Sequence, residues 1–261
     1  MNNHNWSEEK EVYRDYFTTN ISSTKHILRY LWIKENFLHS VTGKRILEIG
    51  CGDGGVIQLL KNTNYVVGID ISISGVENLK QLGIESYLCD ISSENIPFED
   101  GFFDYVLALE VFEHLKSPQH AIEEIQRVCK KDGTVILSIP NYKTGHKFIY
   151  RSLFTFKAFE NYLKDNKFLL IKKLPYGICP PFWNIVKKYF REELQGKKNN
   201  IRGLCIPLTT RLARILSSDF FTFFKPTRLC WLLVYELKNI NPKGAKELYQ
   251  EISEETKTTY R

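Results

Sequence analysis

RILEIGCGDGG, residues 45–55, is the stretch that decides the fold class of this chain. An apolar segment of strand length, 45–49, runs directly into a glycine-rich turn. Gly50, Gly52 and Gly55 have the spacing G-x-G-x-x-G, which is typical of the turn between a first strand and a helix where a nucleotide-like cofactor binds. Because glycine has no Cβ, the backbone of such a turn can approach a ligand closely. The glycines alone do not choose between cofactors.

Short apolar segments alternate with amphipathic ones on both sides of this turn. Such alternation is typical of a parallel sheet with helices on both faces. We therefore predict an α/β fold with a Rossmann-like, seven-stranded, mostly parallel sheet and a ligand site at the carboxyl ends of its strands. The predicted strands are 45–50, 65–70, 86–90, 102–110, 134–140, 168–174 and 230–238, and the predicted helices are 7–17, 22–39, 54–62, 73–82, 118–131 and 155–166.

The alternation is interrupted over residues 176–228, which are aromatic and basic. About 50 residues are too many for an ordinary connection, so we expect a cap inserted before the last strand. From Lys172 to Lys238 there are 13 Lys/Arg and 4 Asp/Glu, which favours an anionic partner or, equally well, a solvated surface. The predicted organisation is an N-terminal helical lid (1–40), a cofactor-binding core (41–175), the basic and aromatic cap (176–228), a closing strand (229–238) and a polar tail (239–261).

The composition places the chain among globular proteins, with 43% apolar and 25% charged residues. Its six cysteines are scattered without a C-x-x-C pair, which argues against a zinc site or a disulfide framework and for the reducing cytoplasm. The segment MNNHNWSEEK has neither the basic start nor the apolar core of a secretory signal, and no apolar run approaches the roughly 20 residues that span a bilayer. We therefore expect a cytoplasmic protein.

Two carboxylates distinguish the glycine turn from a dinucleotide site. Glu48 lies inside the predicted first strand, where a buried carboxylate costs several kcal/mol unless it is paired or used. A cofactor that carries an ammonium and a sulfonium would use it, whereas a dinucleotide has no common need for it. Asp70 ends the second strand 20 residues after Gly50, where a carboxylate can accept two hydroxyl hydrogen bonds. Asp70 could instead cap the next helix, although Ser72 fits that role better.

Five segments in order resemble the class I S-adenosylmethionine-dependent methyltransferase family. They are ILEIGCGDGG (46–55), GIDIS (68–72), LCDIS (88–92), FFDYVLALEVFEHL (102–115) and RVCKKDGTVILSIPN (127–141). The resemblance implies S-adenosylmethionine as cofactor and S-adenosylhomocysteine as product, with Asp70 on the ribose and Asp90 and Ile91 at the adenine. A turn or capping role is the alternative for Asp90. The implied cofactor-binding residues are Glu48, Gly50, Cys51, Gly52, Gly54, Asp70, Ile71, Asp90, Ile91, Leu109 and Glu110.

Glu110, Glu113 and His114 form the pattern E-x-x-E-H after the fourth strand. It resembles the pattern of ubiquinone-pathway O-methyltransferases, where it is linked to a divalent cation and a catechol-like substrate. The three residues are therefore the catalytic candidates, with His114 as a general base or all three around a cation. The alternative is that His114 packs or caps.

Further candidates are expected to face the substrate. Asn141, Tyr142 and His146 follow the fifth strand, and Tyr16 lies with Tyr13, Phe17 and His26 in the predicted lid. Each also fits an ordinary loop or packing role. No [DNS]-P-P-[YFW] follows the fourth strand, which argues against the branch that methylates adenine and amide nitrogens.

The favoured function is methylation of a small molecule, on oxygen, with the cap shaping the pocket. Its basic residues would meet a phosphorylated or carboxylated acceptor; they are Lys187, Lys188, Arg191, Arg211 and Arg214. A lipid-linked acceptor at a membrane surface is an alternative, because LTTRLARIL (208–216) is basic and partly amphipathic. RNA is disfavoured because no RNA-binding module is recognisable. A binding subunit without activity is the non-enzyme alternative, and the complete set of cofactor residues argues against it.

Overall fold

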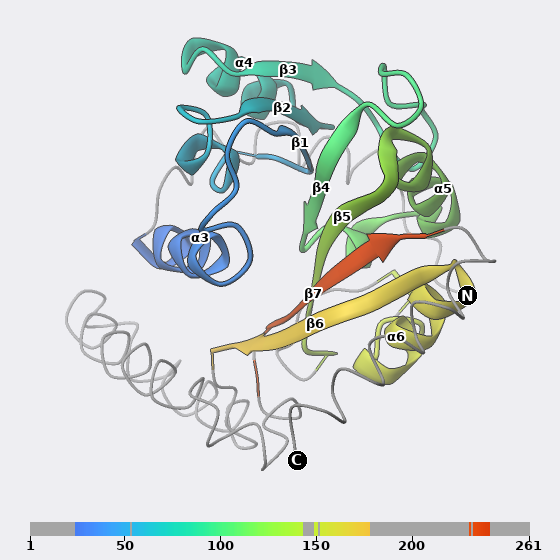
Figure 1. Ribbon diagram of the computed structural model, residues 1–261. Helices are drawn as coiled ribbons and strands as arrows, with labels where there is room; N and C mark the ends of the chain where they lie inside the picture. The colour runs from blue at the N-terminus through green and yellow to red at the C-terminus, as the bar shows by residue number, and fades with distance from the viewer. Residues whose placement is uncertain are drawn as a thin grey trace, which may run out of the picture.

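The computed structural model describes residues 24–52, 54–142, 149–150, 152–177, 230 and 232–240, with side chains from Arg29 onward (Figure 1). Several predictions from the sequence lie outside these residues. They concern the helix at 7–17, the aromatic residues Tyr13, Tyr16 and Phe17, the side chain of His26, His146, the cap beyond Gly177 with its basic residues and segment 208–216, and the polar tail.

Seven strands form one sheet in the order β3-β2-β1-β4-β5-β7-β6. The first five strands in sequence run parallel to one another, and β7 is antiparallel to both of its neighbours, β5 and β6. The predicted seven-stranded, mostly parallel sheet is therefore confirmed. The strands are β1 (Arg45–Ile49), β2 (Tyr65–Asp70), β3 (Glu85–Leu88), β4 (Phe103–Leu109), β5 (Cys129–Pro140), β6 (Phe168–Tyr176) and β7 (Leu232–Asn239).

Helices cover both faces of the sheet. In Figure 1, α3 (Thr24–Phe37) and α4 (Ile73–Gln81) lie on one side, and α5 (Pro118–Val128) and α6 (Phe156–Asp165) lie on the other. Successive strand residues alternate between the two apolar cores: Ile46 packs with α3 and α4, and Leu47 packs with α5 and α6. Ser72 caps α4 by accepting a hydrogen bond from Gly75 N, as the sequence indicated.

The prediction of a helix over 54–62 is wrong. Only the short 3-10 helix η1 (Ile57–Leu59) forms there. Glycines at the start of the segment are costly in a helix, and the β-branched residues Val56 and Ile57 follow them. The amide of Ile57 is also bound by the Glu48 carboxylate, 3.2 Å away. Over the residues that the structure describes, the loop after β1 therefore ends in a tight turn and not in an α-helix.

The predicted helix 118–131 ends earlier than expected, at Val128. The side chain of Asn239 in β7 donates hydrogen bonds to the carbonyl oxygens of Gln126 and Cys129, at 3.0 and 2.9 Å. These bonds take up acceptors that a longer helix would use. The Asp132-Gly133 turn then lies inside β5 as an irregularity opposite β4.

The four described cysteines, Cys51, Cys89, Cys129 and Cys230, are buried thiols. Among the described residues, none of the helices has the length and apolar character required to cross a bilayer.

Candidate cofactor-binding site

The loop after β1 is shaped by glycines with left-handed backbone conformations. Gly50 has a φ of +63°, and a Cβ there would lie 2.5 Å from Cγ2 of Val111, in the loop after β4. Gly55 packs directly beneath the ring of Tyr30 from α3. Any side chain at either position would collide with its neighbour. The sequence pattern thus marks close approaches to two other segments of the chain.

Asp70 holds this loop in place at the end of β2. Its carboxylate accepts hydrogen bonds from the amides of Gly52 and Ser72, each at 2.7 Å, and the residue is 7% exposed. Burial raises the pKa of Asp70, and the backbone hydrogen bonds oppose that rise. The amide of Ile71 is a third backbone donor to this carboxylate, and the acceptor capacity that remains is available to ribose hydroxyls.

Glu48 is buried in β1 and has a partner within the fold. Its carboxylate accepts the hydrogen bond from the amide of Ile57, at the turn that follows the glycine loop. A buried carboxylate here therefore does not by itself require a cationic ligand. A role for Glu48 in binding the cofactor remains a prediction.

The remaining predicted cofactor residues lie around the same sheet edge. Asp90 forms a turn, because its carboxylate accepts from the amide of Ser92 at 3.1 Å. Ile91 is buried, and its carbonyl oxygen lies 3.0 Å from Nδ1 of His120. Cys51 and Gly54 are buried within the glycine loop, whereas Ile71 and Leu109 are half-buried at the carboxyl ends of β2 and β4.

Glu110, directly after β4, has an unusual backbone conformation for a residue with a side chain. Its φ is +56°, a left-handed conformation that costs about 1–2 kcal/mol outside glycine. The Glu110 amide donates to the carbonyl oxygen and the hydroxyl of Ser138 in β5, at 3.1 and 3.0 Å. Its carboxylate accepts a hydrogen bond from Nη1 of Arg29 in α3. Two interactions with distant segments therefore hold the strained residue.

Arg29 is a residue of this site that the sequence did not indicate. Burial alone would lower the pKa of Arg29, but Glu110 and Tyr30 raise it. The Nε atom of Arg29 is buried and has no hydrogen-bond partner among the described residues. Nothing in the helical segment distinguished this arginine from its basic neighbours, because its partner lies 81 residues away in the chain.

Among the E-x-x-E-H residues, Glu110 is paired with Arg29, while Glu113 and His114 are neighbours in the next turn of the chain. Glu113, in the 3-10 helix η2 (Phe112–His114), is completely buried, and burial raises its pKa well above the ordinary value. Nε2 of His114 lies 3.9 Å from Oε1 of Glu113. Within the described ranges, no three His, Cys, Asp or Glu residues are placed to hold a metal ion. The cation alternative is therefore not supported by these residues, and His114 as a base remains a prediction.

Of the predicted substrate residues, Asn141 is 2% exposed and Tyr142 is half-buried. The side chain of Asn141 donates to the carbonyl oxygen of Cys230 at 2.9 Å, which ties the end of β5 to the residues before β7. The fold thus uses the Asn141 amide as a structural link.

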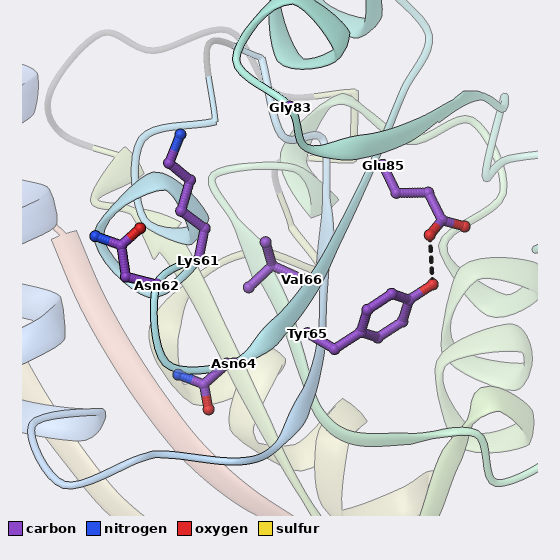
Figure 2. Close-up of a pocket in the computed structure, with 7 residues that line it drawn as sticks. All are labelled: Lys61, Asn62, Asn64, Tyr65, Val66, Gly83 and Glu85. Atoms are coloured by element: carbon purple, nitrogen blue, oxygen red, sulfur yellow. Dashed lines mark hydrogen bonds between the residues drawn. The ribbon is translucent and has the colours of Figure 1, made fainter.

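A surface hollow of about 430 Å³ lies elsewhere, at the amino ends of β2 and β3 (Figure 2). Its walls include Lys61, Asn64 and Gly83, and Tyr65 donates to Glu85 at 2.5 Å. The glycine loop and Asp70 are at the opposite, carboxyl edge of the sheet. The hollow is therefore separate from the candidate site.

The groups at the carboxyl edge fit a ligand that has both a carboxylate and a ribose. Arg29 offers a buried N–H donor, Asp70 offers acceptors for hydroxyls, and the glycine loop lets the backbone come close. The strand order, with β7 antiparallel, is that of the class I S-adenosylmethionine-dependent methyltransferase fold.

Comparison with known proteins gives the same class. Residues 47–137 match the family described as "Methyltransferase domain", for which S-adenosylmethionine is the implied cofactor. A ubiquinone biosynthesis O-methyltransferase of Pseudomonas aeruginosa is 36% identical over 121 residues, which are 44% of this chain and 51% of the relative. A phosphatidylethanolamine N-methyltransferase of Cereibacter sphaeroides is 31% identical over 101 residues, 36% of this chain and 50% of the relative. The chain thus spans about half the length of the curated relatives it matches.

The fold also matches solved structures. A crystal structure of coclaurine N-methyltransferase aligns with a TM-score of 0.52 at 17% identity and covers 84% of this chain and 72% of the other. At that identity the likeness establishes the fold alone.

Proposed function

We propose that this chain transfers a methyl group from S-adenosylmethionine to a small-molecule acceptor, with oxygen favoured over nitrogen as the accepting atom. The observation that carries the proposal is the meeting of Arg29, the glycine loop and Asp70 at one sheet edge of a methyltransferase domain. The O-methyltransferase relative supports oxygen, whereas the N-methyltransferase relative supports a lipid amine as the alternative acceptor.

The residues of the chain divide the task of binding. Arg29 would hold the carboxylate of the cofactor, Asp70 its ribose hydroxyls, and the segment around Asp90 and Ile91 its adenine. The bound cofactor supplies a methyl group on a sulfonium, which is already an activated leaving group. The protein then contributes mainly alignment and exclusion of water, worth about 7–11 kcal/mol in well-oriented reactions.

A base is required only if the acceptor carries a proton at the working pH. For a hydroxyl acceptor, His114 is the proposed proton acceptor, since its partly exposed side chain lies on the loop after β4. The basic segment from Lys172 to Lys238 is proposed to favour an acceptor that carries a phosphate or carboxylate.

Calorimetric titration with S-adenosylhomocysteine tests the proposal. We expect one binding site per chain, and at least about tenfold weaker binding in Asp70→Ala, because charged hydrogen bonds to the ribose are lost. Glu77→Ala removes an exposed carboxylate from α4 and should leave the affinity unchanged. Absence of binding by the unaltered protein would refute the proposed function.

The acceptor is then sought with methyl-labelled S-adenosylmethionine. Catechols, other hydroxyl compounds with a phosphate or carboxylate, and phosphatidylethanolamine vesicles are offered in parallel. Label in the hydroxyl compounds supports O-methylation of a small molecule, whereas label in the vesicles alone favours the lipid alternative.

A further inference from the structure

Glu110 belongs to the E-x-x-E-H motif, yet its carboxylate is turned toward α3 and bonded to Arg29. We propose that Glu110 is a positioning residue that holds the Arg29 guanidinium at the carboxyl edge of the sheet, so that its buried Nε–H is left to donate to the carboxylate of the cofactor. The inference rests on the proposed function, because it assigns a role within the same cofactor site. It gives the first glutamate of the motif a task other than binding a cation or accepting a proton.

The geometry of the guanidinium supports this role. An arginine has five N–H donors in a rigid planar fork, and a carboxylate commonly binds two of them side by side. Nη1 donates to the Glu110 carboxylate, and the guanidinium also has a side-chain hydrogen bond with Tyr30. The buried Nε, without a hydrogen-bond partner among the described residues, lies on the other edge of the fork. Arg29 can therefore hold Glu110 on one side and a second carboxylate on the other.

Glu110 itself is fixed by the sheet. Its left-handed backbone and the hydrogen bonds from its amide to Ser138 place the carboxylate relative to β4 and β5. Backbone strain of this kind persists where the surrounding structure determines the conformation, and it is common at ligand sites. Arg29 is thus anchored, through Glu110, to the central strands of the sheet.

The helix that carries Arg29 is fastened to the same sheet. Lys172 of β6 donates to the carbonyl oxygen of Asn36 at 2.8 Å, near the end of α3. The rings of Trp32 and Tyr176 pack with their centroids 5.2 Å apart. Because α3 is held in this way, forming the ion pair with Glu110 requires only that the Arg29 side chain become ordered.

Removing the charge of Glu110 has opposite effects under two models. If Glu110 merely lies near the bound carboxylate, its loss relieves repulsion between like charges and the cofactor binds more tightly. If Glu110 positions Arg29, its loss frees a long side chain whose ordering must then be provided by the ligand, and binding weakens. The sign of the change therefore decides between the models.

The experiment compares two ligands by calorimetry, S-adenosylhomocysteine and 5′-methylthioadenosine, which lacks the amino-acid carboxylate. Arg29→Gln and Glu110→Gln are each expected to weaken S-adenosylhomocysteine binding about tenfold, and the double variant no more than either single one. All three should bind 5′-methylthioadenosine within about twofold of the unaltered protein. The matched control is Lys173→Gln with Glu160→Gln, an ion pair between β6 and α6 that should change neither affinity.

Equal or tighter binding of S-adenosylhomocysteine by Glu110→Gln would overturn the inference, as would equal weakening of both ligands. Glu110→Asp keeps the charge but shortens the reach, and it should weaken S-adenosylhomocysteine selectively; it takes the place of Glu110→Gln if thermal unfolding shows that the latter does not fold. Failure of the unaltered protein to bind either ligand would instead refute the proposed function, so the two failures are distinguishable.

Discussion

The loop after β1 and the loop after β4 are in contact where Gly50 lies against Val111, but the two loops are held in shape by different interactions. The first loop depends on glycines and on two carboxylates that accept hydrogen bonds from its amides. Asp70 accepts from Gly52, and Glu48 accepts from Ile57. The second depends on charged side chains.

In the loop after β4, Glu110 takes a left-handed conformation without being glycine, and Glu113 is buried. The ion pair of Glu110 reaches across 81 residues to α3. The conformation of the loop after β1 is therefore determined mainly by its own glycines, whereas that of the loop after β4 is determined by side chains distant in the sequence. Substitutions in the first should therefore act through sterics and those in the second through charge.

The largest effect is expected from Gly50→Ala. The left-handed backbone costs alanine about 1–2 kcal/mol, and overpacking against Val111 costs about 1–3 kcal/mol more. The free energy of unfolding should fall by about 3 kcal/mol, measured by denaturant titration. Gly83→Ala is the matched control, because Gly83 has a φ of +70° but open space around it, so only the backbone cost of about 1–2 kcal/mol applies. Equal losses in the two variants would show that the contact between the loops carries no energy.

The same contrast explains what the sequence could predict. The glycine spacing, Asp70 and the alternation of apolar segments are local signals. They predict the strands and the sheet that the structure has, and the edge at which we propose that the cofactor binds. The predicted helix at 54–62 does not form, because its glycines are costly in a helix and the Glu48 carboxylate binds the amide of Ile57. Arg29 left no local signal.

Asn141 is a second residue whose long-range partner the sequence does not indicate. Its position after the fifth strand indicated a substrate residue, but the partner of its side chain, the carbonyl oxygen of Cys230, is 89 residues away. Pairings over such separations are determined by the packed structure, and a single sequence does not display them.

A second effect is expected in the loop after β4 from Glu113→Gln. Burial raises the pKa of Glu113 in the folded state, so its contribution to stability is complete below the unfolded pKa of about 4.3 and is lost as the pH rises through the folded pKa. Glutamine mimics the neutral acid at every pH. The variant should therefore gain stability over the unaltered protein by about 1.4 kcal/mol per pH unit within that window, then level off.

Denaturant titrations of both proteins at a series of pH values from 4 to about 8 measure this difference. Glu123→Gln, at an exposed position of α5, serves as the control and should give a difference that does not vary with pH. A flat profile for Glu113→Gln would mean that the buried carboxylate is ionised and fully compensated.

The smallest effect concerns the contact that joins the two loops. Val111→Ala removes the methyl group that a Cβ at position 50 would strike, so in the Gly50→Ala background it should restore about 1 kcal/mol of the lost stability. Measured relative to Val111→Ala alone, the loss of stability caused by Gly50→Ala should match that of Gly83→Ala, because the left-handed backbone at position 50 is unchanged. A double-mutant cycle over Gly50 and Val111, measured by denaturant titration, gives the coupling energy. A coupling near zero would mean that the loops shift apart to accommodate the methyl group, and that each loop is held by its own side of the sheet.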